Sequence, residues 1–121
     1  MSSAAIEQIS PATNGFPVVP SPRTESGAGR LVISRGPGTG TGFPLSTSLV
    51  TIGRQRANDI ALADSTVSGQ HAEIRIDGDR YLIVDVGSFT GTYVNRQPVD
   101  RLELHDGDEV WIGRHRMVFR R

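Results

Sequence analysis

The stretch HAEIRIDGDRYLIVDVGSFTGTYVN, residues 71–95, decides the fold class. Two runs with alternating apolar residues, 71–76 and 81–86, flank the sequence DGD at 77–79, which is typical of a β-hairpin turn. The loop sequence GSFTG and another short β-rich run follow directly. This stretch therefore predicts antiparallel strands joined by short turns.

The same pattern of short β-rich runs continues on both sides of this hairpin. Turns are expected at Arg96-Gln97 and at His105-Asp106-Gly107, and Pro44 is expected in an edge strand because proline lacks the N–H that a central strand needs. No stretch of usual helix length is amphipathic, and the spacing of the turns favours an all-β sandwich. Further strands are expected at 30–34, 42–45, 48–54, 59–62, 92–95, 109–113 and 116–121.

The first 29 residues differ from the rest of the chain. They are rich in proline and show little apolar periodicity, so we expect a disordered N-terminal tail over 1–29 and one domain over 30–121. The tail has neither the basic start nor the apolar centre of a signal peptide. No apolar run in the chain approaches the length of a membrane span, so a cytoplasmic location is expected.

The overall composition excludes several classes of function. Thirteen basic residues, all of them arginine, balance thirteen acidic residues, so bulk charge does not favour binding to nucleic acid or membranes. The chain has no cysteine, which excludes disulfides, zinc ribbons and a thiol nucleophile. Arginine does supply the planar donor groups that suit phosphate.

Enzymatic functions find little support in the motifs. The glycine-rich sequence RGPGTGTG at 35–42 is followed by a predicted strand and has no lysine, unlike a nucleotide-binding P-loop, so we interpret it as a connection. Ser68, His71 and Asp85 have the residue types of a catalytic triad, but no nucleophile-elbow motif is present. The chain is therefore not expected to be an enzyme.

Metal binding is not expected either. The three histidines at positions 71, 105 and 115 lack the spacing of metal ligands, and the DGD turn lacks the later glutamate of a calcium loop. No cofactor is implied.

Arg54 is the most informative basic residue. It stands where a predicted strand runs into a loop, next to Gly53, which allows the backbone to turn. Ser68 and the loop at 87–91 are expected at the same end of a sandwich, where binding residues gather on loops. A phosphate needs several convergent donors, and arginine supplies charge-assisted ones.

These motifs, taken together, resemble the forkhead-associated (FHA) family. The resemblance covers 31–119 and rests on Gly53-Arg54, Ser68-x-x-His71, the sequence GTYVN at 91–95 and the late GDEVWIG at 107–113. It implies an eleven-stranded β-sandwich with a phosphothreonine site on the loops at one end.

The resemblance also implies roles for individual residues. Arg54 and Ser68 should contact the phosphate, and His71 should hydrogen-bond the loop backbone and position Ser68 without touching the ligand. The expected phosphopeptide-binding residues are Arg54, Ser68, Gly69, Thr90 and Gly91. The expected loop-structuring residues are Gly53, His71 and Asn95.

A closer resemblance is to small actinobacterial FHA regulators of the glycogen accumulation regulator group. It rests on LVISRGP, VDVGS, GTYVNRQPVD and GDEVWIG. In that group, a phosphorylated tail threonine binds the chain's own FHA domain, and 2-oxoglutarate and glutamate enzymes are the targets. The tail offers Thr13 and Thr24 as phosphorylation sites, although neither lies in the paired-threonine motif of the group.

The sequence thus predicts a non-enzymatic, monomeric module that binds phosphothreonine on a partner such as a Ser/Thr kinase or a metabolic enzyme. Two departures leave an alternative open. Gly69 and Gln70 follow the serine where basic or amide residues are frequent in the family, and Thr90 stands where many members carry asparagine. The alternative is an FHA-fold interaction domain that no longer requires phosphate.

Overall fold

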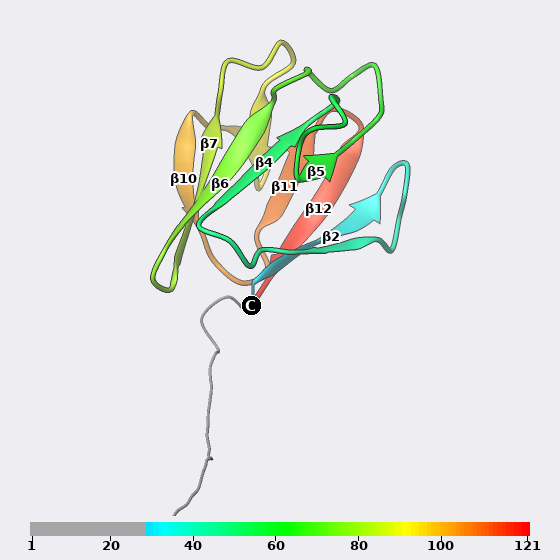
Figure 1. The fold of residues 1–121 in the computed structure, drawn as a ribbon. Coiled ribbons are helices and arrows are strands. Elements are labelled where there is room, and N and C mark those ends of the chain that lie inside the picture. The colour runs from blue at the N-terminus through cyan, green and yellow to red at the C-terminus, as the bar shows by residue number, and fades with distance from the viewer. Residues whose placement is uncertain (1–28) are drawn as a thin grey trace, which may run out of the picture.

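The computed structural model describes residues 29–121, which form two β-sheets packed face to face (Figure 1). The five-stranded sheet has the order β10-β7-β6-β4-β5, and the six-stranded sheet has the order β3-β2-β12-β11-β8-β9. The all-β prediction is confirmed. The strands are β2 Arg30–Arg35, β3 Gly42–Pro44, β4 Leu49–Gly53, β5 Ile60–Ala61, β6 Ala72–Asp77, β7 Arg80–Asp85, β8 Thr92–Val94, β9 Gln97–Pro98, β10 Arg101–Leu104, β11 Glu109–Ile112 and β12 His115–Arg120.

The tail predicted over 1–29 lies outside the described residues, apart from Gly29. The same holds for the candidate phosphorylation sites Thr13 and Thr24. Within the described part, no helix is long and apolar enough to cross a membrane.

The segment after β8 differs from the sequence prediction. The turn lies at Asn95-Arg96, one residue earlier than expected, and both residues have positive φ angles, of 50° and 70°. A two-residue turn with positive φ at both positions matches the twist of the two strands that it joins in a β-hairpin. Gln97 therefore belongs to β9, which the sequence analysis did not predict. The sequence also did not predict β10, an edge strand in which only Leu104 is fully buried.

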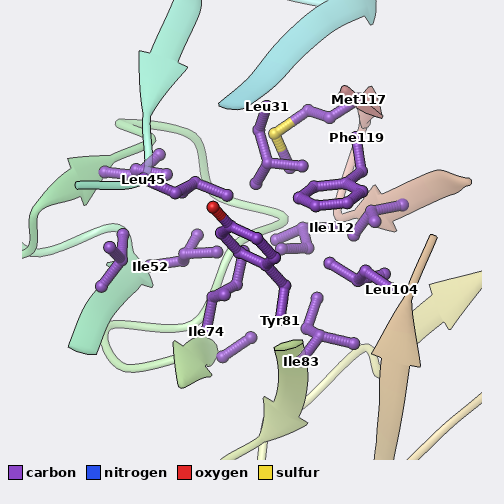
Figure 2. Close-up of a cluster of buried hydrophobic side chains, with 14 of the residues drawn as sticks. Leu31, Leu45, Ile52, Ile74, Tyr81, Ile83, Leu104, Ile112, Met117 and Phe119 are labelled. Carbon is purple, nitrogen blue, oxygen red and sulfur yellow. The ribbon is translucent and has the colours of Figure 1, made fainter. Parts of the chain in front are cut away.

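Other strands follow from the alternation of apolar residues. In β7, Tyr81 and Ile83 are buried, and in β12, Met117 and Phe119 are buried, while the residues between them are more exposed. Pro44 lies in β3, at the edge of the six-stranded sheet, as its missing N–H requires. Figure 2 shows that side chains from both sheets meet in one cluster between them.

Tyr81 joins the two sheets at the centre of this core. Its ring centroid lies 5.0 Å from that of Phe119 across the sandwich, at an interplanar angle of 56°. Its hydroxyl accepts a hydrogen bond of 3.0 Å from the backbone N–H of Gly29. A Cβ atom on Gly29 would lie 2.6 Å from the tyrosine ring, so only glycine fits there. One side chain therefore anchors the start of the domain to its core.

We predict that Tyr81→Phe lowers stability by about 1–2 kcal/mol, because the buried N–H of Gly29 loses its partner while the packing is kept. For a domain of this size, each kcal/mol lowers the melting temperature by roughly 4–8 °C. Thermal and urea unfolding measure the effect. Tyr93→Phe is the matched control, because the Tyr93 hydroxyl has no hydrogen bond within residues 29–121. Equal stability of the two variants would contradict the anchor role.

Candidate functional site

Three loops meet at one end of the sandwich, the upper end in Figure 1. They follow β4, β5 and β7, and they enclose a shallow groove of about 300 Å³. The predicted residues Arg54, Ser68, Gly69 and Thr90 all face this groove. Its lining is completed by Ser65, Thr66, Val67 and Phe89.

Gly53 is required by a close approach of two backbones. The N–H of Arg54 donates to the carbonyl of Ser68 at 2.9 Å, which holds the end of β4 against the loop after β5. A Cβ atom on Gly53 would lie only 2.2 Å from the carbonyl oxygen of Gly69. Any other residue would push these loops apart and move the Arg54 side chain away from Ser68.

Asn58 supports the same approach, and the sequence analysis missed it. The residue is 7% exposed, and its Nδ2 donates to the carbonyls of Gln55 and Gly69 at 2.8 and 2.9 Å. The asparagine thereby bridges the loop after β4 and the loop after β5. The available signal was an amide residue inside a short polar loop, which sequence alone does not distinguish from an ordinary turn residue.

Arg54 and Ser68 present their donors to the groove. Arg54 is exposed, and no carboxylate of residues 29–121 pairs with its guanidinium. Ser68 Oγ accepts the N–H of Phe89 at 2.9 Å. A serine hydroxyl is one donor as well as an acceptor, so its hydrogen remains available for an anion.

His71 connects the second and third loops from beneath the groove. The side chain is fully buried; its Nδ1 accepts the N–H of Ser68 at 3.2 Å, and its Nε2 lies 2.9 Å from the carbonyl of Gly91. Because Nδ1 accepts, Nε2 must carry the hydrogen and donate to Gly91. The backbone N–H of His71 also donates to Ile52 in β4 at 2.9 Å. A single residue thus links β4 with both neighbouring loops.

These contacts leave no catalytic triad. Both ring nitrogens of His71 serve backbone groups rather than the Ser68 hydroxyl or Asp85. Asp85 instead accepts hydrogen bonds from the hydroxyls of Ser88 and Thr92 at 2.5 and 2.7 Å. Partial burial raises the pKa of Asp85, but these hydrogen bonds outweigh it and lower the pKa below its ordinary value. Asp85 therefore shapes the third loop as a carboxylate.

Gly91 and Thr90 complete the third loop. Gly91 has a φ of +90°, a left-handed conformation that favours glycine, and its N–H donates to Ser88 Oγ at 2.9 Å. Thr90 Oγ1 donates to the carbonyl of Thr66 at 3.1 Å. The threonine hydroxyl therefore ties the third loop to the second, and only its acceptor capacity remains for a ligand.

Asn95 lies away from the groove. Its Oδ1 accepts the N–H of Glu109 at 3.0 Å, and its Nδ2 donates to Asp108 at 3.0 Å. These bonds fix the β8–β9 turn against the start of β11. Within residues 29–121, no group of three or more metal-ligating side chains occurs.

Comparison with known proteins connects this geometry to a family. A family model for the FHA domain matches residues 50–113. Glycogen accumulation regulator GarA of Mycolicibacterium smegmatis is 51% identical over 94 residues, which are 78% of this chain and 60% of that relative. Oxoglutarate dehydrogenase inhibitor of Corynebacterium jeikeium is 50% identical over 93 residues, 77% of this chain and 65% of that protein. The chain thus spans about three fifths to two thirds of the length of these curated relatives.

A solved structure agrees with the sequence relatives. It comes from a structural and functional analysis of phosphothreonine-dependent FHA domain interactions, and it superposes with a TM-score of 0.71 at 34% identity. The match covers 77% of this chain and 95% of that domain. With a family model over more than half of the chain and relatives at about 50% identity, the chain belongs to the forkhead-associated (FHA) family.

Proposed function

We propose that this chain is a phosphothreonine-dependent protein–protein interaction module in bacterial Ser/Thr kinase signalling. The observation that carries the proposal is that one groove brings together the exposed Arg54 and the Ser68 hydroxyl, and within residues 29–121 neither the Arg54 guanidinium has a carboxylate partner nor the Ser68 hydroxyl hydrogen an acceptor. A phosphate that enters this groove meets a charge-assisted donor and a hydroxyl donor together. The chemistry is binding, not catalysis.

The partner is a protein that carries phosphothreonine. Relatives named as a glycogen regulator and as an inhibitor of oxoglutarate dehydrogenase support a metabolic enzyme as the target. A Ser/Thr kinase that carries phosphothreonine is a partner of the same chemistry. We place the chain in the cytoplasm as a monomer. A dimer in sedimentation equilibrium, or recovery outside the cytoplasmic fraction, would contradict these two points.

A second function is favoured by two features of the groove. Gly69 offers no side chain to a phosphate, and the Thr90 hydroxyl already donates to Thr66. These features suit an interaction domain that no longer requires phosphate. Pull-down with and without phosphatase treatment separates the two functions, because only the phosphothreonine module loses its partner when phosphate is removed.

We predict that Arg54→Ala weakens binding of a phosphothreonine peptide, chosen from a degenerate library, by roughly thirtyfold or more. The expected loss is on the order of 2 kcal/mol, because a charge-assisted contact with phosphate disappears. Fluorescence anisotropy measures the affinity. Arg101→Ala, an exposed arginine on the edge strand β10, is the matched control and should bind like the wild type. Unchanged binding by Arg54→Ala would exclude the phosphate role of this residue.

His71→Ala should act through the loops rather than through the ligand. We predict a loss of about 1–3 kcal/mol in stability, because the variant leaves Ser68 N–H and the Gly91 carbonyl without their buried partner. Peptide affinity should fall as a consequence. Thermal melting and anisotropy are measured on the same samples. A variant that melts like the wild type but binds no peptide would mean that His71 contacts the ligand directly.

Thr90→Asn should tighten peptide binding by roughly two- to twelvefold, with little effect on stability. An asparagine amide has a donor and acceptor on a longer arm, and one net hydrogen bond is worth about 0.5–1.5 kcal/mol. Thr90→Val, which removes the bond to Thr66, is the comparison variant and should bind more weakly. Weaker binding by Thr90→Asn would contradict this prediction, and binding weaker than that of Thr90→Val would show that threonine itself makes a specific contact with the peptide.

A further inference from the structure

Three polar side chains meet just outside the groove, between the loop after β5 and the β11–β12 turn. Arg114 Nε and Nη2 both donate to Asp64 Oδ1, at 3.1 and 2.7 Å. The Asp64 side chain is 9% exposed, whereas the Arg114 side chain is 62% exposed. Hydrogen bonds from Arg114, and then from Thr66, hold the pKa of Asp64 well below its usual range. Asp64 is therefore a charged carboxylate that Arg114 holds in place.

Thr66 stands at the centre of this cluster. Its Oγ1 donates to Asp64 Oδ2 in a short hydrogen bond and accepts the backbone N–H of Arg114 at 3.0 Å. Its own N–H donates to the same carboxylate oxygen at 3.0 Å. A Cβ atom on Gly113 would lie 2.4 Å from Thr66 Oγ1, so the turn before Arg114 must carry glycine for this approach. Two segments far apart in the sequence are thus joined at one hydroxyl.

Thr66 also lines the groove, in addition to its contacts with Asp64 and Arg114. Its carbonyl accepts the Thr90 hydroxyl from the third loop at 3.1 Å. Ser68 follows two residues later in the same loop. Figure 1 shows the β11–β12 turn at the same end of the sandwich as these loops. Thr66 therefore connects the Asp64–Arg114 pair outside the groove with two of the three loops that form the groove.

We propose that Asp64 and Arg114, outside the groove, and Thr66, at its edge, are positioning residues that set peptide affinity by holding the loops in place. This proposal rests on the proposed function of the groove. Ordering a flexible loop when a ligand binds costs free energy and therefore lowers the affinity. A loop that is already held in place carries no such cost. Exposed ion pairs contribute little in general, but here two guanidinium nitrogens donate to one oxygen of a carboxylate that is mostly buried.

An isosteric pair of variants tests the proposal. Thr66→Val removes the central hydroxyl at nearly constant shape, and Thr66→Ser retains it. We expect Thr66→Val and Arg114→Ala to weaken phosphothreonine peptide binding by roughly two- to twelvefold. Thr66→Ser should stay within about twofold of the wild type. Arg80→Ala, which breaks the exposed pair between Arg80 at the start of β7 and Glu103 in β10, is the matched control and should also stay within about twofold.

Amide hydrogen exchange in the unliganded protein supplies a readout that general destabilisation does not reproduce. The N–H groups of Ser68 and Phe89 bond to His71 and to Ser68 Oγ, so both report on the loops directly. In Thr66→Val and Arg114→Ala, these two amides should exchange faster, while core amides of β6 and β7 should exchange as in the wild type. Thr66→Ser and Arg80→Ala should leave the two loop amides unchanged.

Several results would overturn the proposal. Unchanged affinity in Thr66→Val is one, and an equal loss in Arg80→Ala is another. Weaker binding without faster loop exchange is a third, because Arg114 or Thr66 would then contact the peptide directly. If the wild type shows no preference for phosphothreonine, the proposed function fails on its own. Loop exchange then decides the positioning role, which unchanged rates in Thr66→Val would refute.

Discussion

The buried imidazole of His71 is the interaction on which the rest of the candidate site depends. Its two ring nitrogens form hydrogen bonds with backbone groups on two different loops, and the backbone N–H of His71 donates to Ile52 in β4. A fully buried polar ring is stable only when its hydrogen bonds are satisfied, so the loops and the ring specify each other. The groove is therefore a consequence of the fold, and a phosphate that enters it would meet hydrogen-bond donors that are already in place.

Two further constraints hold the groove from its sides. On one side, Gly53 lets the end of β4 approach the loop after β5, and this places Arg54 beside Ser68. On the other side, the cluster around Thr66 ties the same loop to the β11–β12 turn. Each contact is modest in energy, but together they restrict the loop backbone, and such restriction lowers the entropy cost of binding. We therefore propose that peptide affinity depends on the support of the loops as much as on Arg54 and Ser68, the residues proposed to contact phosphate.

The sequence predicted the parts of this arrangement that are encoded locally. Alternating apolar residues identify β6, β7 and β12, and short motifs identify Arg54, Ser68 and His71 as neighbours of strand ends. By contrast, β10 is an edge strand with one fully buried residue, so its pattern carries little signal. The contacts of Thr66 with Arg114 and Thr90 join residues 48 and 24 positions apart. No local pattern encodes such pairs, because they arise only when the two sheets pack.

The most direct test of this account is the tautomer of His71, measured by the nitrogen chemical shifts and ring proton couplings of the unliganded protein in NMR. Since the N–H of Ser68 donates to Nδ1, the account predicts a single species with hydrogen on Nε2, directed at the Gly91 carbonyl. The Ser68 amide should show a hydrogen-bonded shift before any peptide is added. Hydrogen on Nδ1, or an exchanging mixture of the two tautomers, would contradict a groove that is organised by the fold in advance of its ligand.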